Sequence, residues 1–411
     1  MSRLMRTMLI TILVMAAIPL TPAAAQEMLL PPYCQEGIQA SGAYYFICVP
    51  PVGWNGDLVV FAHGYVSPEL PVGGYPWDQL VLPDGTSLVA IVNGTGYAFA
   101  ASGYSKNGLA VLQGLTDSLE LVNIFESQYI PRYIYLVGAS EGGLITTLGV
   151  ERYPDVFDGG LTTCGPVGDF SKQINYWGDF RVVFDYFFPK VLPGRAVTIP
   201  DALINKWETV YAPKVVQAVS SHPARTSQLL SVTGAPIDPA NPASTLETVL
   251  GLLWYNVYAT NDGVLTLGGQ PFDNSTTKYT GSLNDVLLNR KVKRFIADPI
   301  ALAEIGNYQT SGVLGVPLVS LHTTGDPIVP YWHTLLYDFK VQVSGSSLRY
   351  TNIPVLRYGH CNFNQVEVLV AFGLLISQTS GQPLTAALDV LPDTQLQAAF
   401  IDMAQEYGAW R

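Results

Sequence analysis

Three side chains in this sequence are of the types that together attack a carbonyl group. Ser140 stands in Gly138-Ala-Ser-Glu-Gly142, a G-x-S-x-G pattern, and Asp326 and His360 follow it in that order. A serine hydroxyl is a weak nucleophile, so it needs a histidine to take its proton as it attacks. An aspartate would fix the tautomer of that histidine and stabilise the imidazolium. The set predicts acyl transfer through a covalent intermediate on Ser140.

Each of these residues follows a run that is typical of a buried β-strand. The runs are residues 133–137, 316–321 and 349–355, and they are rich in aromatic, β-branched and leucine residues. A helix is expected from about residue 142, so Ser140 would lie on a sharp turn from strand to helix. The flanking glycines have a steric reason. The serine backbone is strained there, and a larger neighbour would collide with the adjoining strand and helix.

Other acids and histidines compete for the roles of acid and base. Asp298 and Glu304 lie before the predicted strand at 316–321, whereas the acid is expected after the C-terminal end of that strand. Both are therefore weaker candidates than Asp326. We interpret His322 as structural or as a residue that supports the catalytic set without reacting, because it lies at the end of that strand. His333 follows on a helix, and His222 belongs to the insertion at 165–312 that we interpret below as a cap.

The chain up to residue 164 alternates predicted strands with predicted helices. Apolar runs at 58–62 and 97–101 are short enough for buried strands, and leucines and a valine recur at helical spacing between 112 and 122. Such alternation predicts a parallel sheet in an α/β fold.

Residues 165–312 interrupt this alternation, and we interpret them as a cap over the site. The aromatic residues at its start are expected mainly in the core of the cap, with a subset facing the site. Ser244-Thr-Leu-Glu247 fits a capping box, opening a helix that Asn261-Asp-Gly263 would end. The expected organisation is a signal segment at 1–25, a core domain formed by 26–164 and 313–411, and the cap insertion at 165–312.

The first 25 residues have the pattern of a secretory signal. Arg3 and Arg6 precede an apolar run at 8–20, and Ala23-Ala-Ala25 would be the cleavage site before Gln26. Cleavage would leave 19 basic and 32 acidic residues, a net charge of −13. So acidic a chain is a poor candidate for binding nucleic acid. We expect a secreted or periplasmic monomer with no membrane anchor after cleavage.

Four cysteines in an exported chain predict two disulfides, and four cysteines allow three pairings. Cys34 and Cys48 are close in sequence and flank a predicted hairpin, so we pair them, which leaves Cys164 with Cys361. Free buried thiols are the alternative, which an oxidising compartment disfavours.

The joint pattern resembles the α/β-hydrolase-fold serine hydrolases, whose catalytic residues come in the same order of nucleophile, acid and histidine. The resemblance covers most of the chain outside 165–312. Within this group, the chain is similar to secreted bacterial esterases with a cap insertion. It implies a mostly parallel central sheet flanked by helices, with no metal or organic cofactor. It also implies an oxyanion hole, because the residue after a His-Gly such as His63-Gly64 donates its main-chain N–H, as does the residue after the nucleophile. Here these residues are Tyr65 and Glu141.

Tannase-like and feruloyl-esterase-like hydrolases of this fold tie the histidine loop to the nucleophile with a disulfide. Cys361 directly follows His360, but the residue before the nucleophile is Ala139 rather than Cys. By this resemblance, a bond from Cys164 at the end of the next predicted strand would hold the His360 loop.

The sequence does not decide the class of substrate. The first interpretation is an ester hydrolase for apolar or aromatic esters, including polyesters, because the cap is rich in apolar and aromatic residues. The alternative is a serine peptidase of the prolyl or aminopeptidase type, which would need acids to bind an amino terminus. Asp169, Asp179 and Asp185 in the cap are candidates. A non-catalytic binding protein is disfavoured by the complete catalytic set.

Overall fold

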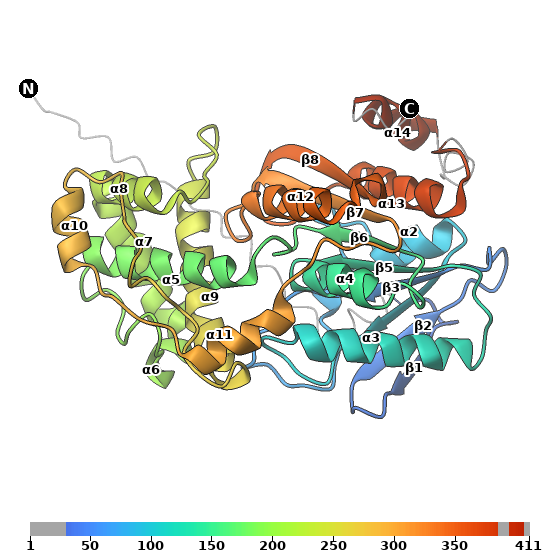
Figure 1. The fold of residues 1–411 in the computed structure, drawn as a ribbon, viewed down its shortest axis with the longest axis horizontal. Coiled ribbons are helices and arrows are strands. Elements are labelled where there is room, and N and C mark those ends of the chain that lie inside the picture. Colours follow the sequence, from blue (N-terminus) through green and yellow to red (C-terminus); the bar gives the residue numbers. More distant parts are fainter. Residues whose placement is uncertain (1–29, 385–393, 407–411) are drawn as a thin grey trace, which may run out of the picture.

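The computed structural model describes residues 30–384 and 394–406 (Figure 1). The signal segment predicted at 1–25 lies outside the described residues. None of the described helices has both the length and the apolar character that a membrane span needs.

An eight-stranded sheet has the strand order β1-β2-β4-β3-β5-β6-β7-β8. β1 and β2 form an antiparallel hairpin that joins β4, and the strands from β3 to β8 run parallel to one another. The strands are β1 (Gln35–Ile38), β2 (Tyr44–Cys48), β3 (Leu58–Ala62), β4 (Ala98–Ser102), β5 (Ile134–Ala139), β6 (Gly159–Thr163), β7 (Leu318–Gly325) and β8 (Tyr350–Tyr358).

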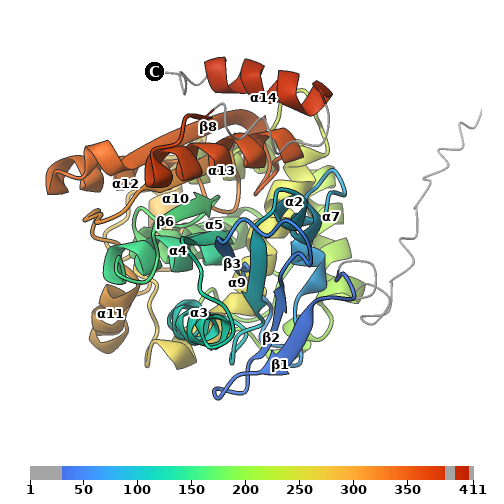
Figure 2. The ribbon, with the colours of Figure 1, turned by 90° about the vertical axis from the view of Figure 1, so that its right-hand side faces the viewer.

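Helices cover both faces of this sheet (Figure 2). One face carries α3 (Val111–Glu126), α4 (Glu141–Arg152) and α12 (Trp332–Ser344), and the other carries α2 (Leu88–Gly94), α13 (Gln365–Ser380) and α14 (Thr394–Glu406). Successive side chains of a strand point to opposite faces, so Val60 packs toward α3 and α4 while Val59 and Phe61 pack toward α13. A strand buried on both faces is a continuous apolar run, as β3 is. The predicted fold class, a mostly parallel sheet flanked by helices, is confirmed.

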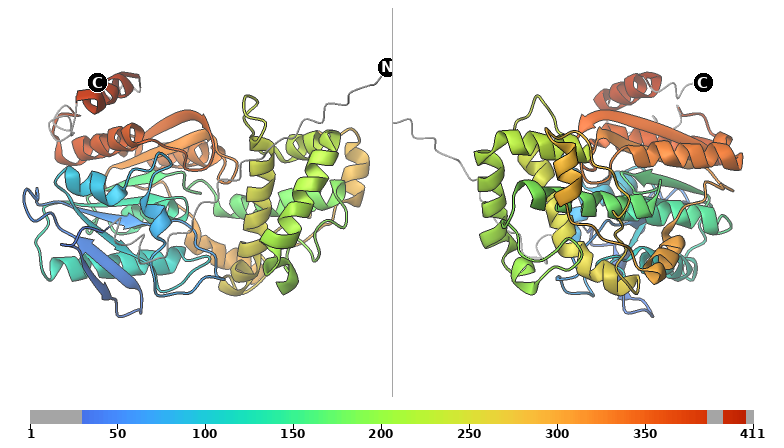
Figure 3. Two further views of the ribbon diagram at one scale, coloured as in Figure 1. Left: turned by 180° about the vertical axis from the view of Figure 1, so that it is seen from behind. Right: turned by 60° about the vertical axis from the view of Figure 1, so that its left-hand side comes forward.

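The segment between β6 and β7 is helical and lies beside the sheet (Figures 1 and 3). α5, α8 and α9 pack together around an apolar cluster that includes Phe180, Phe184 and Leu253. Trp177, by contrast, lines a cavity next to the sheet. The helices are α5 (Phe170–Phe187), α6 (Asp201–Ile204), α7 (Ala212–Ser221), α8 (Pro223–Thr233), α9 (Ser244–Thr266), α10 (Asp285–Lys291) and α11 (Pro299–Ile305). Short helical turns are η1 (Trp77–Leu80), η2 (Trp207–Tyr211), η3 (Gly306–Tyr308) and η4 (Ser347–Arg349).

Two predictions about α9 are wrong. Ser244 is the first helical residue after Ala243 and makes no capping bond; its hydroxyl instead bonds the preceding turn at Asp238 and Asn241. The helix also continues through the predicted stop to Thr266. Tertiary contacts outweigh the local signal there, because Asn261 exchanges two hydrogen bonds with the backbone of Ile199.

Candidate active site

Ser140 lies on the tight turn between β5 and α4. Its backbone has φ 57° and ψ −118°, a left-handed conformation that is strained for a residue with a side chain. A Cβ on Gly138 would lie 2.2 Å from the carbonyl oxygen of Gly142, and a Cβ on Gly142 would lie 1.9 Å from that of Ala62. Both positions therefore require glycine, and the turn lifts the serine hydroxyl out of the sheet.

The structure brings Ser140, His360 and Asp326 into one hydrogen-bonded chain. His360 Nε2 is 2.8 Å from Ser140 Oγ, and His360 Nδ1 is 2.7 Å from Asp326 Oδ2. A carboxylate can only accept, so Nδ1 carries the proton and Nε2 is free to accept from the serine. β7 and β8 extend beyond the predicted strands, and these neighbouring parallel strands bring the two partners together at one edge.

Asp326 is fully buried and held from three sides. The N–H groups of Ile328 and Val329 donate to its Oδ1 at 2.8 and 3.0 Å. Burial alone would raise the pKa of Asp326, but charge and hydrogen bonds from His360 and His322 lower it to about 2. The carboxylate is therefore ionised at neutral pH and can stabilise an imidazolium at His360.

The rival residues do not join this chain. His322 Nε2 donates to the Val329 carbonyl at 2.8 Å and lies 3.5 Å from Asp326 Oδ2, so it supports the acid from behind. His333 is buried on Gln173, and His222 lies at the end of α7. Asp298 and Glu304 bond residues of their own region, Gln270 and Asn307.

The predicted oxyanion donors flank the nucleophile. Neither the Tyr65 nor the Glu141 main-chain N–H donates to any residue that the structure describes. The loop carrying Tyr65 passes close to the nucleophile, because a Cβ on Gly64 would lie 3.2 Å from Ser140 Cβ. Gln79, which the sequence did not indicate, holds this loop: its Oε1 accepts from Gly64 N–H at 2.6 Å.

Two disulfides are present, Cys34–Cys48 and Cys164–Cys361. Cys164 follows Thr163, whose carbonyl accepts the Ser140 N–H at 2.9 Å, and Cys361 follows His360. The second disulfide therefore joins the strand beside the nucleophile to the loop of the base. Among the described residues, the one cluster of metal-ligand size is Cys164, His360 and Cys361, and bonded sulfurs are not thiolate ligands.

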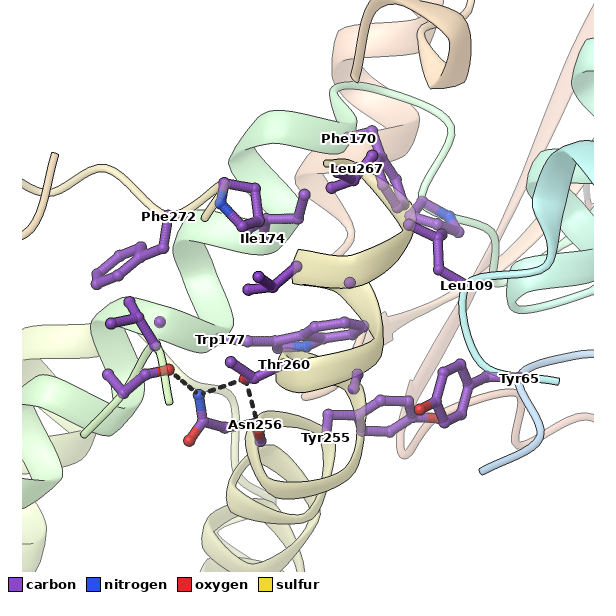
Figure 4. Close-up of a pocket in the computed structure, with 18 of the residues that line it drawn as sticks. Tyr65, Leu109, Phe170, Ile174, Trp177, Tyr255, Asn256, Thr260, Leu267 and Phe272 are labelled. Atoms are coloured by element: carbon purple, nitrogen blue, oxygen red, sulfur yellow. Dashed lines mark hydrogen bonds between the residues drawn. The ribbon is translucent and has the colours of Figure 1, made fainter. Parts of the chain in front are cut away.

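A mostly apolar cavity opens at Ser140 between the sheet and the helical segment (Figure 4). It reaches from Tyr65 and Leu109 past α9 to Phe272. Its lining residues are Tyr65, Leu109, Ser140, Glu141, Pro166, Phe170, Ile174, Trp177, Gly178, Ala196, Val197, Tyr255, Asn256, Ala259, Thr260, Gly263, Val264, Leu267, Gln270, Pro271, Phe272 and Val329.

A second pocket meets Ser140 from the side of α2 and α13. Leu82, Leu88, Leu161 and Phe363 are among its apolar lining residues, and it also contains His360 and the ring of Tyr255. Ser140 thus lies where two apolar pockets meet.

Tyr255 of α9 was missed by sequence reasoning. It lines both pockets at Ser140, and its ring stacks on Trp177 with 4.7 Å between centroids. It also packs against Tyr65, with 5.6 Å between centroids. No local pattern marks it, because it is one of several aromatic residues in an ordinary amphipathic helix.

The Glu141 side chain is a buried acid beside the nucleophile. It is 8% exposed, and its Oε1 accepts the Ala110 N–H at 2.9 Å. Burial, together with the charge of Asp262, raises the pKa of Glu141 to about 8, while the Ala110 bond and Lys106 act to lower it. The carboxyl is thus neutral over much of the pH range below 8.

The fold and the Ser140–His360–Asp326 chain together define an α/β-hydrolase-fold protein with a serine-histidine-aspartate site. Neither a comparison with models of protein families nor a comparison with curated proteins finds a match.

Solved structures of similar arrangement do exist. Feruloyl esterase B from Aspergillus oryzae is 14% identical over 85% of this chain and 80% of its own, with a TM-score of 0.46. An esterase of Pyrococcus furiosus is 10% identical over 81% of this chain and 84% of its own, with a TM-score of 0.42. An acylaminoacyl peptidase of Pyrococcus horikoshii is 13% identical, with a TM-score of 0.39; the match covers 80% of this chain but only 37% of that one.

Proposed function

We propose that this chain is an exported serine hydrolase that cleaves carboxylic esters through an acyl-enzyme on Ser140. The observation that carries the proposal is the hydrogen-bonded chain from Ser140 Oγ through His360 to the buried Asp326. The signal-like first 25 residues and two disulfides support an oxidising, exported location. We assign residues 165–312 as the cap and the mature chain as a monomer.

The reaction follows from the placement of the donors and acceptors. Ser140 Oγ attacks the ester carbonyl carbon while its proton passes to His360 Nε2, and Asp326 stabilises the imidazolium. The main-chain N–H groups of Tyr65 and Glu141 donate to the oxyanion, and losing one such donor costs about 3–4 kcal/mol. His360 returns the proton to the leaving alkoxide as the C–O bond breaks. Water, deprotonated by the same histidine, then hydrolyses the acyl-enzyme.

The surroundings of Ser140 favour esters over peptides with a free amino terminus. Of the acids considered for binding an ammonium group, Asp169 caps α5, Asp179 accepts from Tyr279 and Asp185 pairs with Arg181. None of the three lines either pocket at Ser140. Among the described residues, Glu141 is the one acid that lines a pocket at Ser140, and burial keeps its carboxyl neutral over most of the pH range below 8. Apolar pockets suit apolar or aromatic groups on both sides of an ester, and a polyester offers the same groups in a chain.

A substrate panel with the mature protein tests the proposal. The panel contains p-nitrophenyl esters of graded acyl length, aromatic esters, a polyester film and aminoacyl p-nitroanilides, with Ser140→Ala as the control. We expect ester turnover that Ser140→Ala abolishes. Cleavage of the anilides with no ester turnover would replace the proposal by the peptidase alternative.

A further inference from the structure

Two residues that line the cavity between Ser140 and Phe272 each carry a buried polar atom with no hydrogen-bond partner among the described residues. These atoms are the Tyr65 hydroxyl oxygen and Glu141 Oε2. The other polar side chains of the lining are bonded: Asn256 to Thr260 and Ala196, and Gln270 to Phe272. A buried polar atom left without a partner costs about 1–3 kcal/mol, so two in one apolar cavity call for an explanation.

Both residues line the same cavity as the nucleophile. Burial raises the pKa of Tyr65, and the largest contribution from another residue is the charge of Glu141. The Tyr65 ring packs against Tyr255 of α9 (Figure 4). Its centroid also lies 6.0 Å from that of Trp254 on the same helix. Glu141 is fixed by its bond to Ala110, which leaves Oε2 as its free atom. The pair is therefore held in place before any ligand arrives.

The position of His360 decides which part of a substrate reaches this cavity. The histidine must deliver a proton to the leaving oxygen, so the leaving group lies on its side of Ser140. His360 lines the pocket near Leu88 and a smaller opening near Trp254, but it does not line the cavity with Tyr65 and Glu141. The acyl group is thus the part that enters this cavity.

The chemistry of the pair selects a neutral oxygen. Below a pH of about 8 the Glu141 carboxyl is protonated and can donate, and a tyrosine hydroxyl can donate or accept. An ammonium group would have to leave water for a cavity whose remaining walls are mostly apolar, which is costly without an ionised partner. A hydroxyl or ether oxygen can instead bond both groups without a charge.

We propose that this cavity is the acyl-binding site and that Tyr65 and Glu141 recognise a neutral oxygen substituent on an otherwise apolar acyl group. The preferred substrates are then esters of hydroxylated or alkoxylated apolar acids. This inference rests on the proposed ester hydrolysis at Ser140.

Three ethyl esters test it, with acid release followed by titration at pH 7. They are ethyl butanoate, ethyl 3-hydroxybutanoate and leucine ethyl ester, which carry no substituent, a neutral oxygen and an ammonium group. We expect kcat/KM for the hydroxylated ester to exceed that for the plain ester by about tenfold, since a site built to bond a hydroxyl disfavours the analogue without it. Tyr65→Phe keeps the ring and removes only the unpartnered hydroxyl, and it should lower this ratio by about fivefold or more.

Two further variants sharpen the comparison. Glu141→Gln keeps an acceptor for Ala110 and a donor toward the cavity, so it should retain most of the preference. Tyr135→Phe removes another buried, unpartnered tyrosine hydroxyl, one that lies outside both pockets, and should leave the ratio unchanged.

Equal rates for the plain and hydroxylated esters, or a preference that Tyr65→Phe does not change, would overturn the inference while leaving ester hydrolysis intact. A preference for the leucine ester would overturn it in favour of an ammonium site. Turnover of none of the esters would instead refute the proposed function on which it rests.

Discussion

Asp326 illustrates how one buried side chain determines the state of the reacting atoms. Its Oδ1 is occupied by two main-chain N–H groups, so Oδ2 alone faces His360 and fixes the proton on Nδ1. An amide at this position would offer an N–H where an acceptor is needed and would favour the wrong tautomer.

Asp326→Asn should therefore lower kcat by about 10⁴-fold, as loss of the tautomer-fixing acid does in other serine hydrolases, while the protein stays folded. Steady-state kinetics on p-nitrophenyl butanoate, with Tm as the measure of folding, check this. Asp298→Asn is the matched control for the rival acid and should keep kcat within a fewfold. A larger loss in Asp298→Asn than in Asp326→Asn would reverse the assignment of the acid.

Glu141 leads to a second prediction at this scale, which concerns how the free energy of unfolding depends on pH. Its folded pKa of about 8 lies above the ordinary value of 4.5. Between these values the folded state holds a proton that the unfolded state has lost, so the free energy of unfolding falls as pH rises. Each pKa unit is worth about 1.4 kcal/mol, which makes the expected loss a few kcal/mol.

Glu141→Gln removes this titration, so its stability should fall less than that of the wild type between pH 5 and pH 8. Urea unfolding at several pH values measures the difference. Parallel curves for the two proteins would contradict a buried, neutral carboxyl at Glu141.

At the scale of elements, strand ends and one disulfide hold the site together. Asp326 and His360 follow adjacent parallel strands, and Cys164–Cys361 ties the His360 loop to the end of β6. The bond closes a loop with a sequence separation of 197 residues, for which the chain-entropy estimate is about 5 kcal/mol.

Replacing Cys164 and Cys361 together by alanine should lower the free energy of unfolding by about 2–5 kcal/mol and also lower kcat, because the loop of the base is released. The control is the Cys34→Ala, Cys48→Ala pair, whose bond spans only 14 residues and lies away from Ser140. This control variant should lower the free energy of unfolding by a smaller amount and leave kcat unchanged. Equal kcat losses in the two double variants would show that the Cys164–Cys361 bond has no special role in placing His360.

Much of the core could be predicted from local sequence, because buried parallel strands are short apolar runs and the turn at Ser140 needs glycines at fixed positions. The two strands that lead to Asp326 and His360 followed from the same patterns, although both continue beyond their predicted ends. Tyr255 and Gln79 could not be predicted, since each reaches the site through a tertiary contact that leaves no local signature. The predicted end of α9 failed for the same reason, because Asn261 is bonded to a distant backbone.

At the scale of the whole molecule, the cavity that we propose as the acyl site lies between the sheet and the helical segment. The sheet side contributes Ser140 and Leu109, while α5 and α9 contribute Ile174, Trp177 and Tyr255. If that proposal holds, the size of the acyl group is set where the helical segment meets the sheet.

Ile174→Trp should shorten the accepted acyl chain. We expect kcat/KM for the p-nitrophenyl octanoate to fall by tenfold or more relative to the acetate, because the larger ring fills the cavity away from Ser140. Leu88 lines the other pocket, so Leu88→Trp should instead change how kcat/KM depends on the size of the alcohol group. If Leu88→Trp altered acyl length and Ile174→Trp altered alcohol preference, the assignment of the two pockets would be reversed.

The central claim is that Ser140 is a nucleophile activated by His360, and covalent labelling tests it most directly. The mature protein is treated with a fluorophosphonate, and the adduct is located by peptide mass spectrometry. We predict a single adduct on the peptide that contains Ser140, absent in Ser140→Ala and strongly slowed in His360→Ala. No adduct on that peptide, or labelling as fast without His360, would contradict the claim.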